Sequence, residues 1–78
     1  MTSETNLLAV IERKRPELNK SESKVAAAIL RNPEETTRSS IASLAAQAGV
    51  SEPSVNRFCK KFGASGFPDF KLRMARSL

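Results

Sequence analysis

The side chains with the clearest chemistry lie in the stretch SEPSVNRFCKKF, residues 51–62. On a helix, at about 100° per residue, its apolar side chains fall on one side and its polar and basic ones on the other. The outward set is Pro53, Asn56, Arg57 and Lys60, with Ser54 and Lys61 at its edges. An arginine can bond the O6 and N7 of guanine, an asparagine can bond adenine or a phosphate, and lysines neutralise phosphates. This face therefore suits the major groove of duplex DNA.

The first turn of that segment carries two serines and one acidic residue. Ser51 and Ser54, together with the free backbone N–H groups of a helix start, can hold a phosphate oxygen. Pro53 offers a base no donor, and Glu52 repels phosphate unless it accepts a hydrogen bond from the N4 amino group of cytosine. We therefore expect Arg57 to be the main base-reading residue, with Glu52 as a weaker second.

The other interpretation of this basic face is a solvated helix surface, which is the more common case for a helix taken alone. The residues just before it favour DNA. Residues 40–62, SIASLAAQAGVSEPSVNRFCKKF, have the pattern of two helices joined by a tight turn. Ala45 leaves room where the helices cross, and Gly49 supplies a positive φ in the turn. The sequence thus predicts a helix-turn-helix whose recognition helix covers about 52–62.

Caps and prolines predict the helices that must hold this motif in place. A helix over 4–15 ends before Pro16, because the residue before a proline is pushed out of the helical region. Asn19 and Glu22 form a capping box that opens the next helix, which stops near Asn32.

Asn32 as an N-cap, followed by Pro33 at the first helical position and Glu35 at the third, predicts a short helix over 33–38. Ser40 and Ser51 are the N-caps of the two motif helices, and Gly63 ends the second one in the left-handed conformation. A last helix covers about 66–77. No segment has the pattern of a strand.

The composition limits the kinds of site that the chain can build. It has 78 residues, 40% of them hydrophobic, with one cysteine (Cys59) and no histidine. An internal disulfide and a Cys/His zinc site are therefore excluded, and we expect a small all-α bundle without a cofactor. No activated nucleophile or Gly-rich phosphate loop indicates an enzyme. No apolar run approaches the roughly 20 residues of a membrane span, so we expect a cytoplasmic protein.

The positive charge is concentrated in the second half of the chain. Residues 1–38 carry seven Lys or Arg and six Asp or Glu, whereas residues 39–78 carry six and two. Most of the net charge of +5 therefore lies in the half that contains the predicted recognition helix. Such an excess favours polyanions through steering and counterion release, although composition alone would fit a soluble basic protein equally well.

Four pieces of the chain together resemble a known family. LNKSESKVAAAILRNPEE, SIASLAAQAGVS, SVNRFCKKFG and SGFPDFK, within about residues 18–76, are similar to the N-terminal DNA-binding domain of the RpiR family of bacterial transcription regulators. The similarity is greatest to the branch of that family that controls hexose catabolism. The combination is specific, whereas any one piece alone would be a weak signal.

The resemblance implies a five-helix, homeodomain-like helix-turn-helix domain without a wing, covering residues 1–78. It implies a homodimer that binds a pseudo-palindromic operator in double-stranded DNA. Full-length relatives continue into a sugar-phosphate-binding domain, which we expect to be absent from this chain, so that a sugar-phosphate effector concerns that domain only. One departure is Ser43, which stands where relatives often have an acidic residue that completes the capping box of Ser40.

By position, the resemblance places the DNA contacts on the serines and on the polar face of the recognition helix. These residues are Ser40, Ser51, Ser54, Asn56, Arg57, Lys60 and Lys61. Lys71, on the last helix, is an additional candidate for a phosphate contact, and Glu52 is kept as the weaker base reader named above.

A second hypothesis is that the same motif serves as a protein-interaction or dimerisation module without reading DNA. It would require a large exposed apolar patch, and the four phenylalanines are all needed for the core. Both terminal helices have apolar residues that could make a symmetric dimer contact. These residues are Leu7, Leu8 and Ile11 on the first helix and Leu72, Met74 and Leu78 on the last.

Overall fold

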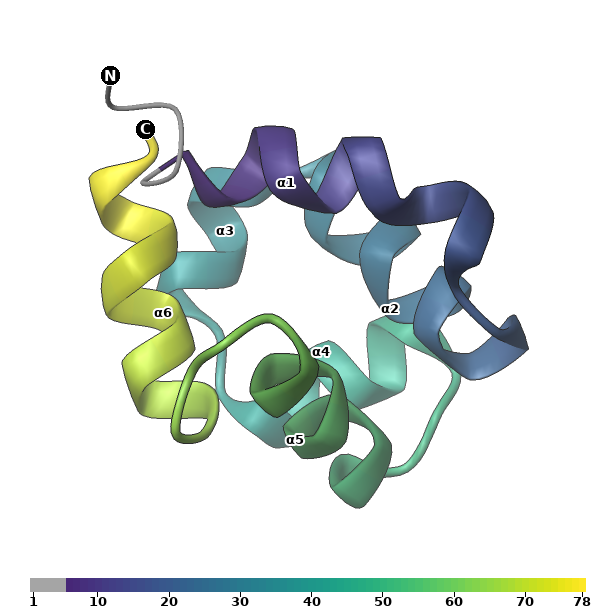
Figure 1. Ribbon diagram of the computed structural model, residues 1–78. Helices are drawn as coiled ribbons and strands as arrows, with labels where there is room; N and C mark the ends of the chain where they lie inside the picture. Colours follow the sequence, from purple (N-terminus) through teal and green to yellow (C-terminus); the bar gives the residue numbers. More distant parts are fainter. Residues whose placement is uncertain (1–5) are drawn as a thin grey trace.

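Six α-helices and one short 3-10 turn make up the part of the chain that the computed structural model describes, residues 6–78 (Figure 1). In chain order they are α1 (Leu7–Lys14), η2 (Arg15–Glu17), α2 (Lys20–Arg31), α3 (Pro33–Arg38), α4 (Ile41–Ala48), α5 (Glu52–Lys61) and α6 (Phe67–Arg76). Residues 6–78 contain no strand, which confirms the all-α prediction. The count of five helices that the resemblance implies is wrong for residues 6–78, whereas the short helix that the caps and prolines predict over 33–38 is present as α3.

Side-chain caps mark the starts of the first two helices, and that of α2 was predicted from the sequence. Asn6 caps α1 by accepting a hydrogen bond of 3.2 Å from the Ala9 N–H; residues 4 and 5 of the predicted first helix lie outside the described range. Asn19 and Glu22 form the predicted capping box of α2. The Glu22 N–H donates to Asn19 Oδ1 over 2.8 Å, and the Asn19 N–H donates to Glu22 Oε1 over 2.9 Å.

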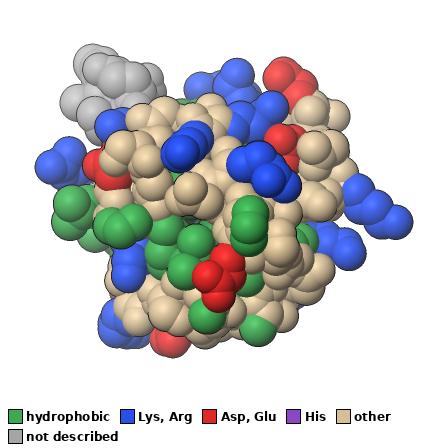
Figure 2. Space-filling view, turned by 90° about the horizontal axis from the view of Figure 1, so that it is seen from below, with side chains coloured by type: hydrophobic (Ala, Val, Ile, Leu, Met, Phe, Trp, Pro, Cys, Tyr) green, Lys and Arg blue, Asp and Glu red, His purple; other side chains and the backbone are tan. Residues whose placement is uncertain are grey.

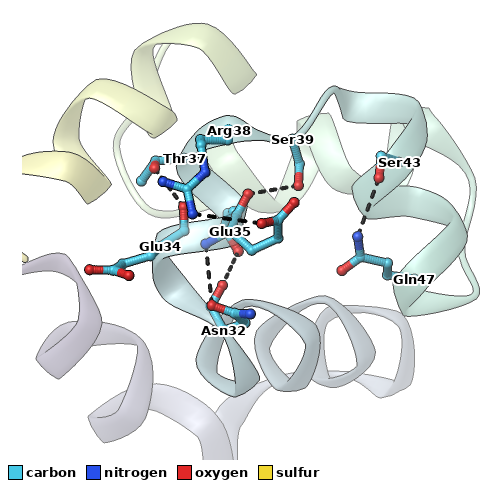
Figure 3. A network of polar contacts seen from close by, with 9 residues as sticks. Asn32, Glu34, Glu35, Thr37, Arg38, Ser39, Ser43 and Gln47 are labelled. Carbon is cyan, nitrogen blue, oxygen red and sulfur yellow. Dashed lines mark hydrogen bonds and ion pairs between the residues drawn. The ribbon is translucent and has the colours of Figure 1, made fainter.

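The short helix α3 is separated from α2 by one residue. Asn32 ends α2, and its Oδ1 then accepts a hydrogen bond of 3.3 Å from the Glu35 N–H (Figure 3). Pro33 occupies the first position of α3, where a missing N–H costs nothing. The asparagine cap and the proline together explain why the chain turns here and does not continue as one long helix.

Apolar side chains from every helix except α3 form one core, to which α3 adds the buried Thr36. The largest fully buried side chains are Phe58, Phe70, Ile11, Ile29, Leu44, Met74, Val25, Val55 and Cys59. Phe58 on α5 lies at the centre, with its ring centroid 4.7 Å from that of Phe62 and 6.0 Å from that of Phe70. The inner face of the predicted recognition helix is thus held by aromatic contacts.

The apolar residues of the two terminal helices divide between core and surface. Leu7, Ile11 and Met74 are buried, so the prediction that they are available for a dimer contact is wrong. They are buried because α1 packs across both α2 and α6 and closes the core (Figure 1). Leu72 and Leu78 are 63% and 56% exposed.

Helices α4 and α5 form the predicted helix-turn-helix, and both pack against α2. Gly49 has φ +73°, in the left-handed region. A Cβ at this position would meet no atom within 4 Å, so the turn favours glycine for its backbone conformation and not for lack of space. The N–H groups of Gly49 and Val50 both donate to the Ala45 carbonyl, over 2.9 and 3.0 Å. Ala45 is buried at the crossing of the helices, as the sequence predicts.

The end of α5 also follows the prediction, since Gly63 has φ +92°. The chain then turns through residues 63–66 into α6, which packs against α1, α3 and α5. None of the described helices is both long enough and apolar enough to cross a bilayer.

Candidate nucleic-acid interface

The two faces of α5 differ as predicted. Val55, Phe58 and Cys59 are buried. The remaining positions of the helix lie at the surface, either exposed (Glu52, Pro53, Arg57, Lys60, Lys61) or half-buried (Ser54, Asn56). Because the buried positions anchor α5 in the core, its polar face is presented to solvent on a rigid element, which is what a reading helix requires.

A chain of hydrogen bonds follows the N-terminal turns of α5. Ser51 is the N-cap, and its Oγ accepts from the Ser54 N–H over 3.3 Å. The two hydroxyl oxygens of Ser51 and Ser54 are 3.0 Å apart. Arg57 Nη2 donates to Ser54 Oγ over 3.3 Å. The guanidinium of Arg57 is therefore directed back toward the start of α5, where recognition helices usually contact base edges.

Asn56 has a more restricted position than the other polar residues of α5. It is half-buried, and a Cβ built on Gly66 would lie 3.4 Å from its Oδ1. The side chain of Asn56 therefore lies beside the connection between α5 and α6. Gly66 was not among the predicted site residues, and no local sequence signal identifies it, because the contact joins two different elements.

The two neighbouring lysines of α5 have different surroundings. Lys60 is exposed, and its side chain forms no ion pair or hydrogen bond with any residue of the described range. Lys61 Nζ lies 3.7 Å from Glu22 Oε2, at the N-terminus of α2. Sequence reasoning did not include Glu22 in the site, since its recognisable signal is the capping box of α2.

Ser40 begins α4 on the other half of the motif. It is exposed, and its Oγ accepts from the Ser43 N–H over 3.0 Å. Ser43 Oγ in turn accepts from Gln47 Nε2 over 3.2 Å (Figure 3). The first turn of α4 contains no acidic residue, so no carboxylate of that turn neutralises the positive end of its helix dipole.

Lys71 belongs to α6 and not to the predicted recognition helix α5. Its Nζ donates to the carbonyl oxygen of Ser39 over 3.0 Å and lies 4.9 Å from the centroid of the Phe67 ring. Among the predicted contact residues, Lys61 and Lys71 both have a charged group that contacts a distant part of the fold, Lys61 a carboxylate of α2 and Lys71 a backbone carbonyl.

Figure 2 shows the side of the molecule on which α5 lies in Figure 1. Basic side chains lie at the edge and in the upper part of this side, apolar and uncharged atoms occupy much of its middle, and an acidic group lies near its centre. The surface therefore offers positive charge at its rim for a phosphate backbone.

The described residues include no group of three or more His, Cys, Asp or Glu arranged to hold a metal ion. Burial raises the pKa of the Cys59 thiol to about 12, so this cysteine is a neutral core residue at ordinary pH.

Comparisons with known proteins agree with the resemblance. A family model described as "Helix-turn-helix domain, rpiR family" matches residues 5–78. The chain is 58% identical over 73 residues to the HTH-type transcriptional regulator HexR of Pseudomonas aeruginosa, covering 94% of this chain and 26% of that protein. HexR of Escherichia coli is 52% identical over 73 residues, covering 94% and 25%.

A solved structure has the same fold. The crystal structure of the N-terminal domain of ybbH from Bacillus subtilis superposes with a TM-score of 0.84 and 37% sequence identity, over 90% of this chain and 85% of that chain. The present chain spans about a quarter of the length of the two HexR proteins. The length of the family match and the shared fold lead to one conclusion: the chain belongs to the rpiR family of helix-turn-helix domains.

Proposed function

We propose that this chain is the sequence-specific DNA-binding domain of a bacterial transcription regulator of sugar catabolism. The observation that carries the proposal is the exposed polar face of α5, whose opposite face is buried in the core and contacts α6 through the rings of Phe58 and Phe70. Two relatives with more than half of their aligned residues identical are named as transcriptional regulators. A cytoplasmic location, where bacterial DNA is found, is part of this proposal.

In this proposal, α5 enters the major groove and its residues divide into two roles. Arg57 reads a guanine, because its guanidinium is directed toward the first turn and can donate two parallel hydrogen bonds. Asn56 contacts adenine or a phosphate from its position beside Gly66, and Glu52 is a second base reader that accepts from cytosine. The proposed phosphate contacts are Ser40, Ser51, Ser54, Lys60 and Lys61.

We also propose that the regulator acts as a homodimer on a pseudo-palindromic operator. The exposed Leu72 of α6 and the exposed Leu78, two residues after the end of α6, support a contact between two copies, since exposed large apolar side chains are favourable in a symmetric interface. A sugar-phosphate effector belongs to the part of the full-length relatives that this chain does not match.

The test of the proposed function is selection of bound duplexes from a random DNA pool, followed by a salt titration of the selected duplex. We expect enrichment of one sequence with two related half-sites. We also expect the logarithm of the binding constant to fall linearly with the logarithm of the salt concentration, by about 0.9 for each phosphate neutralised. A flat salt dependence together with no enriched sequence would refute the proposal.

A further inference from the structure

The residue that follows α3, Ser39, is buried, and its N–H, hydroxyl and carbonyl groups all form hydrogen bonds. Ser39 is only 5% exposed. Its N–H donates to the Thr36 carbonyl over 3.2 Å, and its hydroxyl donates to the Glu35 carbonyl over 2.8 Å (Figure 3). These two bonds tie Ser39 to α3, on its N-terminal side. The remaining polar group of Ser39, its carbonyl oxygen, faces α6.

Lys71 of α6 is the partner of that carbonyl. Its Nζ donates to Ser39 O over 3.0 Å, and the same ammonium lies over the ring of Phe67, one helical turn earlier, at 4.9 Å from the centroid. Phe67 is 4% exposed and Lys71 is half-buried. A buried carbonyl that loses its partner is destabilising, and a cation on an aromatic face is attracted by the ring. Both contacts therefore hold the ammonium at this place.

The position of this contact matters for α4. Ser39 and Ser40 are both extended, with ψ of 154° and 164°, and Ser40 is the N-cap of α4. The carbonyl that Lys71 binds thus belongs to the peptide immediately before the residue that starts α4. Lys71 links this peptide to α6, a helix that packs against α3 and α5.

We propose that Lys71 is a positioning residue, which holds the start of α4 and Ser40 in place for DNA and does not itself bind a phosphate. This inference rests on the proposed function. An ammonium that moved to a phosphate would leave the buried Ser39 carbonyl without its partner and would leave the ring of Phe67. The contacts of Lys71 are therefore better explained by an internal role than by the phosphate contact that its charge suggests.

The test compares three variants of the full chain. Lys71→Met keeps the apolar stem and removes the charge and the donors, whereas Lys71→Arg keeps a donor for Ser39. Arg76→Met is the matched control, because it removes one positive charge from an exposed position of the same helix. The measurements are the amide ¹H–¹⁵N shifts of residues 39–43, the unfolding temperature, and the salt dependence of binding to a random-sequence duplex and to the selected duplex.

For Lys71→Met we expect shifted amide signals in residues 39–43, a lower unfolding temperature, and a several-fold weaker affinity at every salt concentration. The slope against salt should equal that of Arg76→Met, and Lys71→Arg should restore the wild-type amide signals. A slope shallower by about one unit in Lys71→Met alone would identify a phosphate contact and overturn the proposal. Unchanged amide signals in Lys71→Met would also overturn it.

Failure of this inference can be told apart from failure of the proposed function. If the wild-type chain shows no salt-dependent DNA binding, the proposed function fails, and the amide signals still test the link between Lys71 and Ser39. If Lys71→Met does not fold, Lys71→Gln takes its place, because it removes the charge and keeps a neutral N–H donor. A salt slope equal to that of Arg76→Met supports the positioning role, and a slope shallower by about one unit refutes it.

Discussion

The carboxylate of Glu22 lies 3.7 Å from the ammonium nitrogen of Lys61 and joins the first turn of α2 to the last turn of α5. Glu22 is at the same time the acidic member of the capping box of α2. One carboxylate therefore both stabilises a helix start and neutralises part of the basic face that is proposed to contact DNA. The adjacent Lys60 carries no such partner among the described residues.

Removal of the Glu22 charge should strengthen DNA binding. Glu22→Gln keeps an amide oxygen for the Asn19 N–H, so the capping box is retained, while Lys61 becomes free to neutralise a phosphate. We expect a higher affinity for random-sequence duplex DNA and a salt slope steeper by up to about one unit. Glu34→Gln, at an exposed position of α3, is the control for the change in net charge. Equal changes in DNA affinity and salt slope in Glu22→Gln and Glu34→Gln would show that the Glu22–Lys61 ion pair does not affect DNA binding.

Arg57 should carry the largest share of base discrimination. Arg57→Ala is expected to reduce the free-energy difference between selected and random duplexes by about 1–3 kcal/mol, because a bidentate contact to one base is lost. Lys60→Ala is the comparison, since loss of a phosphate contact weakens both duplexes alike and lowers the salt slope by about one. Competition binding of the two duplexes measures the ratio. An unchanged ratio in Arg57→Ala would assign base reading to another residue.

Gly49 should tolerate no ordinary side chain without loss of stability. Its φ of +73° lies in the left-handed region, and a Cβ there would meet no neighbouring atom within 4 Å. Any cost of Gly49→Ala is therefore one of backbone conformation, which we expect to be about 1–2 kcal/mol in the free energy of unfolding. Gly49→Asn should cost less, because asparagine tolerates this conformation better. Denaturant unfolding measures both, and a neutral Gly49→Ala would contradict the explanation.

The stability of the protein should depend on the Cys59 thiol at alkaline pH. Burial raises the pKa of Cys59 from 9.0 to about 12, so the folded state resists loss of this proton more than the unfolded state does. The contribution of the protonated thiol to the free energy of unfolding is fully present below pH 9 and is lost as the pH rises toward 12. Wild type should therefore lose stability in this window faster than Cys59→Ala, by at most about 1.4 kcal/mol per pH unit.

Unfolding curves of the two proteins between neutral and alkaline pH give this difference. A thiol reagent at neutral pH is a second measurement, because the fully buried Cys59 should react only after unfolding. Parallel pH profiles of the two proteins, or rapid labelling of the native protein, would show that the thiol is accessible.

Local chemistry made much of this fold predictable. The helix starts at Asn19, Ser40 and Ser51 were predicted because a short polar side chain can bond the free N–H groups of its own first turn. The left-handed residues Gly49 and Gly63 were predicted for a similar reason, since glycine adopts that conformation at little cost. The inward face of α5 followed from helical periodicity alone. All of these features depend on residues within a few positions of one another.

The sequence by itself thus determined the all-α class, the helix-turn-helix and the direction in which Arg57 and Lys60 face. Only the tertiary structure decided which cations are free, because the partners of Lys61 and Lys71 come from α2 and from the peptide before α4. It also decided that Leu7 and Met74 are buried while Leu72 is exposed. Periodicity places a residue on one side of its own helix, whereas a distant contact depends on how separate helices pack.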